Sequence, residues 1–110
     1  MSARPLARVE DIPDGGAILA DGEALILTRV GARVFAYRNR CPHAGHTLQR
    51  RSGKLIVQEG RYLLCAAHLA SFALESGACV GGPCFETGLA RMPVEVRDGA
   101  VYALSLRAEA

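Results

Sequence analysis

Apolar and polar residues alternate with a period of two over most of the chain, in short stretches separated by turn residues. This alternation predicts strands at residues 6–12, 17–20, 24–30, 33–37, 54–58, 61–64, 71–74, 92–97 and 101–106. Gly31-Ala32, Glu59-Gly60 and Asp98-Gly99 separate three pairs of these strands and predict hairpin turns. No long stretch keeps the 3.6-residue period of an amphipathic helix. We therefore expect an all-β fold of small antiparallel sheets.

Two polar, irregular segments interrupt the strand pattern. Residues 39–52 contain Pro42, Gly45 and three arginines, and residues 78–85 contain Gly81-Gly82-Pro83. Both are predicted to be loops. The 110 residues fit one domain over residues 1–110, since no linker, internal repeat or low-complexity tract divides them.

Composition narrows the classes of protein that the chain can be. The formal net charge is only +2, and no run of Lys or Arg is long enough to bind nucleic acid. The start of the sequence lacks the apolar region of a secretory signal, and no apolar run approaches the length of a membrane span. We therefore expect a soluble cytoplasmic protein. In that compartment, four cysteines indicate metal or redox chemistry more often than disulfides.

Two short segments place a cysteine close to a histidine. The first is Cys41-Pro42-His43 and the second is Cys65-Ala66-Ala67-His68, and each comes after a predicted strand. If the two loops face each other, one iron of a binuclear cluster receives two thiolates and the other receives two imidazoles. A tetrahedral zinc site is the alternative for two cysteines and two histidines, although zinc sites usually space paired ligands more widely than Cys-x-His.

The two segments together resemble the paired ligand motifs of Rieske ferredoxins. The loop residues around them fit as well, namely Pro42, Gly45, Phe72, Gly77 and Gly82-Pro83, the last pair resembling the proline loop that covers the cluster. The resemblance implies a Rieske-like fold over the chain, with two cluster-binding loops and a cluster-binding part at about residues 39–85. It also implies one Rieske-type 2Fe–2S cluster bound by Cys41, His43, Cys65 and His68.

Several positions around the expected cluster depart from this family. Leu69 replaces the usual glycine after the second histidine, and Ala66 replaces a frequent proline. High-potential Rieske proteins carry a disulfide whose cysteines correspond to His46 and Ala67, and Ser and Tyr hydroxyls that correspond to Ala70 and Phe72. Fewer hydrogen bonds to the cluster sulfurs stabilise the reduced cluster less, so we expect a low reduction potential. The residues expected around the cluster are Gly45, His46, Leu69, Ala70, Phe72 and Pro83.

Other candidate residues have simpler interpretations. We expect His46 to be a solvated loop side chain rather than a proton relay. A disulfide between Cys79 and Cys84 is geometrically conceivable, but the expected compartment favours two reduced thiols. The exposed arginines near the first loop form either a basic docking rim for an acidic partner or a set of solvated side chains with no shared task; they are Arg38, Arg40, Arg50 and Arg51.

The resemblance implies an electron carrier and not an enzyme. In this family, such a ferredoxin passes single electrons from a flavin-dependent ferredoxin reductase to the terminal oxygenase of an aromatic-ring-hydroxylating system. The chain has three histidines, and the cluster takes two, so only His46 is left for an oxygenase iron that needs two histidines and a carboxylate. We expect a monomer with no nucleic-acid or membrane partner. The alternatives are the small subunit of an assimilatory nitrite reductase and a zinc-stabilised interaction module.

Overall fold

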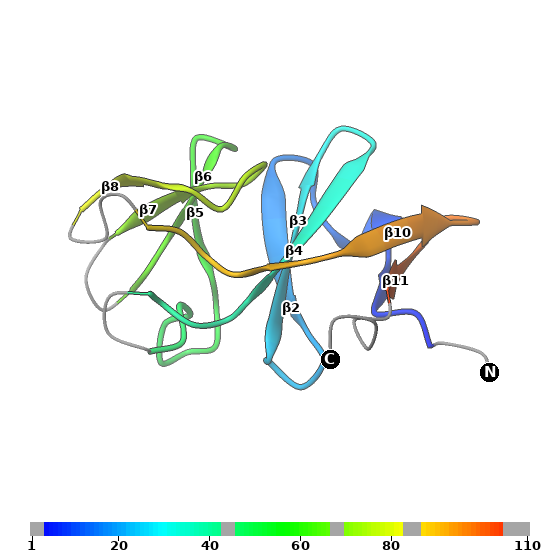
Figure 1. Ribbon diagram of the computed structural model, residues 1–110, viewed down its shortest axis with the longest axis horizontal. Coiled ribbons are helices and arrows are strands. Elements are labelled where there is room, and N and C mark those ends of the chain that lie inside the picture. The colour runs from blue at the N-terminus through cyan, green and yellow to red at the C-terminus, as the bar shows by residue number, and fades with distance from the viewer. Residues whose placement is uncertain (1–3, 43–45, 67–69, 83–86, 105–110) are drawn as a thin grey trace.

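The computed structural model describes residues 4–42, 46–66, 70–82 and 87–104 of the chain. In this part, short antiparallel strands form three sheets that follow one another along the longest axis of the molecule (Figure 1). The overall dimensions are 40 × 32 × 24 Å. The prediction of an all-β fold built from small antiparallel sheets is confirmed for the described residues.

The strands are β1 (Ala7–Arg8), β2 (Gly16–Ala20), β3 (Leu25–Val30), β4 (Arg33–Arg38), β5 (Ile56–Gln58), β6 (Tyr62–Leu64), β7 (Ser71–Ala73), β8 (Cys79–Gly81), β9 (Arg91–Met92), β10 (Val94–Arg97) and β11 (Ala100–Ala103). They form sheets in the orders β1-β11-β10, β2-β3-β4-β9 and β5-β6-β7-β8. The three predicted hairpins are present as β3–β4, β5–β6 and β10–β11.

The central sheet separates two apolar cores, because successive side chains of a strand point to opposite faces. In β3, Leu25 and Leu27 pack with Ile12 and Val101 in the core beside β1, β10 and β11. Ile26, between them, belongs to the other core, which also contains buried residues of β6, β7 and β8. The third sheet, β5–β8, therefore packs on a rigid, doubly covered hairpin.

The first predicted strand, at residues 6–12, is largely wrong. Only Ala7 and Arg8 pair with β11, and a 3₁₀ helix, η1 (Val9–Asp11), follows. The Arg8 backbone N–H donates to the Asp11 carboxylate at 3.1 Å, which stabilises the turn of this helix. This side-chain hydrogen bond competes with the pairing of a strand, and the alternation of apolar and polar residues gives no sign of it.

Two further predictions need correction. Residues 79–81 of the predicted loop form β8, which pairs with β7 across a bulge between Ser71 and Phe72. The predicted strand at 92–97 is divided at Pro93, because proline has no N–H to continue a ladder. The chain changes sheet there: β9 pairs with β4, and β10 pairs with β11. Residues 83–85 and 105–106 of the predicted elements lie outside the described residues.

A shared carbonyl joins the central sheet to the turn after β7. The Leu74 carbonyl accepts hydrogen bonds from the Tyr37 hydroxyl and from the Thr28 hydroxyl, each at 2.8 Å. All three residues are almost completely buried. Because buried polar groups are costly unless they are paired, this contact fixes the position of β7 on the β3–β4 hairpin.

Candidate metal centre

Two cysteines that form no disulfide lie completely buried in one apolar core. Cys41 follows β4 after two residues, and Cys65 directly follows β6. Both have an exposed fraction of 0%, and both pack in the core that contains Leu48, Leu63 and Phe72. The two strand ends thus deliver one cysteine each to the same part of the molecule, as the sequence predicts.

A backbone hydrogen bond from each cysteine closes a loop of the same size. The Cys41 N–H donates to the His46 carbonyl at 2.6 Å, and the Cys65 N–H donates to the Ala70 carbonyl at 2.9 Å. In sequence, the candidate ligand His43 falls inside the first loop and His68 inside the second. The chain therefore presents two loops of the same length, each beginning at a buried cysteine and containing one candidate histidine ligand.

The second loop is also bonded to the segment that follows the first loop. The Ala66 N–H, next to Cys65, donates to the Leu48 carbonyl at 3.0 Å. Leu48 is completely buried and comes two residues after the end of the first loop. This bond places the segments after the two cysteines side by side, which is the arrangement that a cluster bridging both loops requires.

Asn39 supports the first loop, and the sequence analysis missed this role. Its side-chain oxygen accepts the Leu48 N–H at 2.8 Å. Its amide nitrogen donates to the Glu23 carbonyl at 2.9 Å and to the Gln49 side chain at 2.7 Å. The side chain is nearly buried and fully used. Sequence offers a weak signal only: an amide residue two positions before a candidate ligand.

Some of the residues expected around the cluster lie within the described part of the chain. Ala70 and Phe72 are completely buried, and neither carries a hydroxyl. Gly82 has φ +90°, and a Cβ there would lie 2.8 Å from the Ala70 Cα, so the chain after β8 packs closely on the end of the second loop. His46 is exposed, as expected for a loop side chain.

The remaining candidates lie outside the described residues; they are His43, Gly45, His68, Leu69 and Pro83. Within the described residues, no group of three or more His, Cys, Asp or Glu side chains is placed to hold a metal ion. The two buried thiols and their matching loops fit the cysteine half of a Rieske site. The four-residue ligand set stays a prediction.

Cys79 corrects one expectation. It is disulfide-bonded, unlike Cys41 and Cys65, so the prediction of a reduced thiol at position 79 is wrong. That prediction relied on the expected compartment, and local geometry outweighs it: the left-handed backbone of Gly82 turns the chain directly after β8. Cys84 lies outside the described residues.

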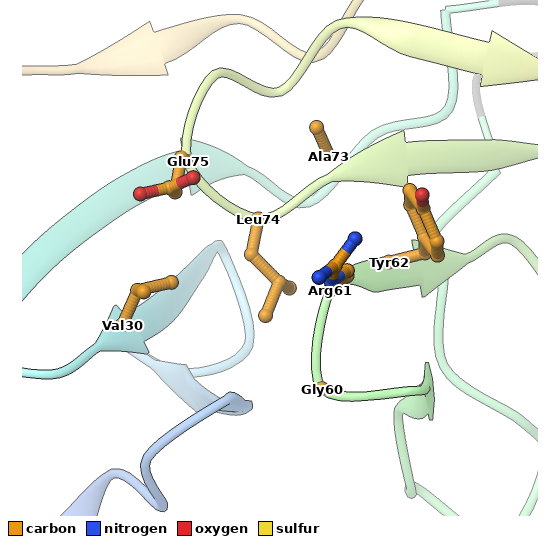
Figure 2. A pocket seen from close by; sticks show the side chains of 7 residues that line it. All are labelled: Val30, Gly60, Arg61, Tyr62, Ala73, Leu74 and Glu75. Atoms are coloured by element: carbon orange, nitrogen blue, oxygen red, sulfur yellow. The ribbon is translucent and has the colours of Figure 1, made fainter.

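A hollow away from the two thiols offers no metal ligand of the expected kind. It has a volume of about 450 Å³ and lies between the β5–β6 turn, the end of β7 and the end of β3 (Figure 2). Its lining residues are Val30, Gly60, Arg61, Tyr62, Ala73, Leu74 and Glu75. Glu75 is already paired with Arg33 at 3.2 Å. The hollow contains neither Cys nor His and is not part of the candidate metal centre.

Three comparisons place this fold and site among known proteins. No curated protein matches the sequence. Among solved structures, a ferredoxin of Sphingomonas yanoikuyae B1 is 27% identical, with a TM-score of 0.73 over 94% of this chain and 99% of that one. The ferredoxin of carbazole 1,9a-dioxygenase from Nocardioides aromaticivorans IC177 is 22% identical, with a TM-score of 0.71 over 94% and 97%.

Larger proteins contain the same fold as one part. The terminal oxygenase of carbazole 1,9a-dioxygenase from Novosphingobium sp. KA1 is 24% identical, with a TM-score of 0.72 over 92% of this chain but only 29% of that one. In the described residues, no helix is long and apolar enough to cross a membrane.

The family model of the Rieske [2Fe-2S] domain matches residues 2–105. The chain therefore belongs to the Rieske [2Fe–2S] domain family.

Proposed function

We propose that the chain is a one-electron carrier whose Rieske cluster is bound by Cys41, His43, Cys65 and His68. The pair of matching loops carries this proposal, because each begins at a completely buried cysteine and is closed by the N–H of that cysteine. The family match over residues 2–105 supports one Rieske domain over residues 1–110, with the cluster-binding part at about 39–85.

When bound, a Rieske cluster accepts and releases one electron at a potential above that of an all-cysteine cluster. The chain's own residues exclude water from the cysteine side, since both thiols are completely buried. The backbone bonds of the two loops hold the ligand-bearing segments in fixed positions. Ala70 and Phe72 provide no hydroxyl to the cluster sulfurs, which supports a low potential for this protein.

The electron acceptor in this proposal is a terminal oxygenase. A solved complex of reduced oxygenase and oxidized ferredoxin in carbazole 1,9a-dioxygenase includes a chain 25% identical to this one, with a TM-score of 0.69 over 91% of this chain and 90% of that one. We extend that pairing to this chain, with a flavin-dependent ferredoxin reductase as the electron donor. The protein then acts in the cytoplasm as a monomer, and catalysis takes place in the oxygenase.

Electron transfer between purified proteins tests this function. The cluster-loaded protein is reduced by one electron, separated from the reductant without oxygen, and mixed with an oxidised terminal oxygenase of a carbazole 1,9a-dioxygenase system. We expect the ferredoxin spectrum to return to its oxidised form while the oxygenase gains one electron for each ferredoxin. A sirohaem nitrite reductase is the matched second acceptor. Transfer to that enzyme, with none to the oxygenase, contradicts the proposal.

A further inference from the structure

The charges of this chain are unevenly distributed along the sequence. From residue 24 to residue 58 there is no Asp or Glu, although the chain as a whole has 11 acidic and 13 basic residues. The basic residues in this stretch are Arg29, Arg33, Arg38, Arg40, Arg50, Arg51 and Lys54. The stretch includes the first ligand loop. Although the formal net charge of the chain is only +2, this segment is therefore strongly cationic.

The interactions of these basic side chains show which of their charges are paired. Arg29 donates to the Ile12 and Gly31 carbonyls, and Arg33 pairs with Glu75. By contrast, five exposed basic side chains of this stretch form no ion pair within the described part of the chain. They are Arg38, Arg40, Arg50, Arg51 and Lys54, which we call the cationic face. These five basic residues therefore flank the first cysteine loop in the sequence.

Two arginines of the cationic face line a hollow beside both cysteine loops. The hollow has a volume of about 550 Å³, and its lining residues are His46, Thr47, Gln49, Arg50, Arg51 and Ala66. The His46 carbonyl accepts the Cys41 N–H, and Ala66 directly follows Cys65. The hollow is thus built from the residues that close the first loop and begin the second.

We propose that the cationic face docks an acidic surface of a protein redox partner, and that a carboxylate of the partner binds in the hollow between Arg50 and Arg51. Guanidinium groups suit this role because they bind carboxylates through two parallel hydrogen bonds. Positive charge that is concentrated at the docking site also raises the association rate with an anionic partner, most strongly at low salt. This inference rests on the proposed function and names the charge of the partner.

Small redox complexes of opposite charge measure the local charge directly. The fully reduced, cluster-loaded protein is mixed with hexacyanoferrate(III) or with tris(phenanthroline)cobalt(III), and each oxidant takes one electron from each cluster. Second-order rate constants are followed by absorbance at about 10 mM and at about 1 M ionic strength, where the Debye lengths are about 30 Å and 3 Å. For the natural chain, we expect salt to slow the anionic oxidant and to accelerate or leave unchanged the cationic one.

A double charge reversal, Arg50→Glu with Arg51→Glu, tests the two residues of the hollow. The matched control is Arg4→Glu with Arg61→Glu. Arg4 is exposed and precedes β1, which belongs to the sheet at the other end of the molecule from β5–β8 (Figure 1). Arg61 is exposed and lies four residues before Cys65, which corresponds to roughly 13 Å along an extended strand. Each Arg→Glu change lowers the charge by two, so each pair takes the formal net charge from +2 to −2.

We expect the hollow variant to slow oxidation by hexacyanoferrate(III) about tenfold or more at low salt, and the control about twofold or less. At high salt both variants should approach the natural rate. Equal slowing by both pairs, or a hollow variant within threefold of the control, overturns the docking proposal. A protein that binds no cluster shows no redox reaction with either oxidant and refutes the proposed function instead.

Discussion

The aromatic ring of Tyr37 lies directly against Gly77, so closely that a Cβ on residue 77 would lie 2.6 Å from the tyrosine Cε1. Gly77 also has φ +74°, a conformation that residues with a Cβ rarely adopt. The Tyr37 hydroxyl meanwhile donates to the Leu74 carbonyl. Tyr37 of β4 therefore contacts both ends of the turn between β7 and β8, which holds the β5–β8 sheet on the central sheet.

Gly77→Ala should destabilise the protein by about 2–4 kcal/mol, because it combines a left-handed backbone with a clash against the tyrosine ring. The matched control is Gly22→Ala, where φ is +61° and nothing lies within 4 Å of the new Cβ. That control should cost only about 1 kcal/mol. Free energies of unfolding from denaturant titration make the comparison, and equal losses would refute the close contact.

Tyr37→Phe should cost about 1 kcal/mol, the usual net value of one hydrogen bond. The loss should not be larger, because the Leu74 carbonyl keeps its second donor, the Thr28 hydroxyl. Tyr102→Phe, in the partly exposed β11, serves as the control and should change the free energy of unfolding by less than about 0.5 kcal/mol. Indistinguishable effects of the two substitutions would show that the buried hydroxyl bond contributes nothing.

Alkaline pH should weaken the fold through the same residue. Burial raises the pKa of Tyr37 from 10.0 to about 12, because it disfavours the phenolate. The stability that follows from this raised pKa is fully present below pH 10 and is lost as pH rises through about 12. The slope is up to about 1.4 kcal/mol per pH unit for one proton.

Unfolding free energies measured at intervals from pH 9 to pH 12 should show this loss in the natural protein and in the Tyr102→Phe variant. In the Tyr37→Phe variant, the free energy of unfolding should fall less steeply with pH, by the contribution of up to one proton. A variant that loses stability as steeply as the natural protein would contradict the raised pKa of Tyr37.

Phe72→Tyr should raise the reduction potential of the cluster. Position 72 is completely buried in the core that contains both cysteines, and it corresponds to a tyrosine in high-potential Rieske proteins. One added hydrogen bond of about 1.4 kcal/mol corresponds to about 60 mV for a one-electron couple. The control is Phe35→Tyr, which adds a hydroxyl on β4. If both variants keep the natural potential and an intact cluster, the expectation that missing hydroxyls lower the potential is wrong.

The sequence predicts most of the strands and the three hairpins, because period-two alternation and glycine-containing turns mark them locally. It also predicts that Cys41 and Cys65 come together, and the structure places both in one core. The division of the last strands at Pro93 was missed, since the alternation continues through the proline while the hydrogen-bonding partner changes from β4 to β11.

Other features depend on contacts between residues distant in sequence. Asn39 supports the first loop through its bonds to the Leu48 N–H, the Glu23 carbonyl and Gln49, and the sequence shows none of these bonds. The disulfide at Cys79 was missed because the expected compartment favoured a reduced thiol. The lack of ion pairs on the cationic face likewise required knowing where the acidic side chains lie.

In the proposed site, two thiolates and two imidazoles bind one 2Fe–2S cluster. Electron paramagnetic resonance of the reduced protein, with resolution of the nitrogen hyperfine couplings, reads out this set of ligands. We predict a signal from one reduced cluster for each chain, coupled to two imidazole nitrogens, with one coupling lost when either His43 or His68 is replaced by Cys. A colourless protein with one zinc ion and no labile sulfide, or a cluster signal without nitrogen coupling, would contradict the account.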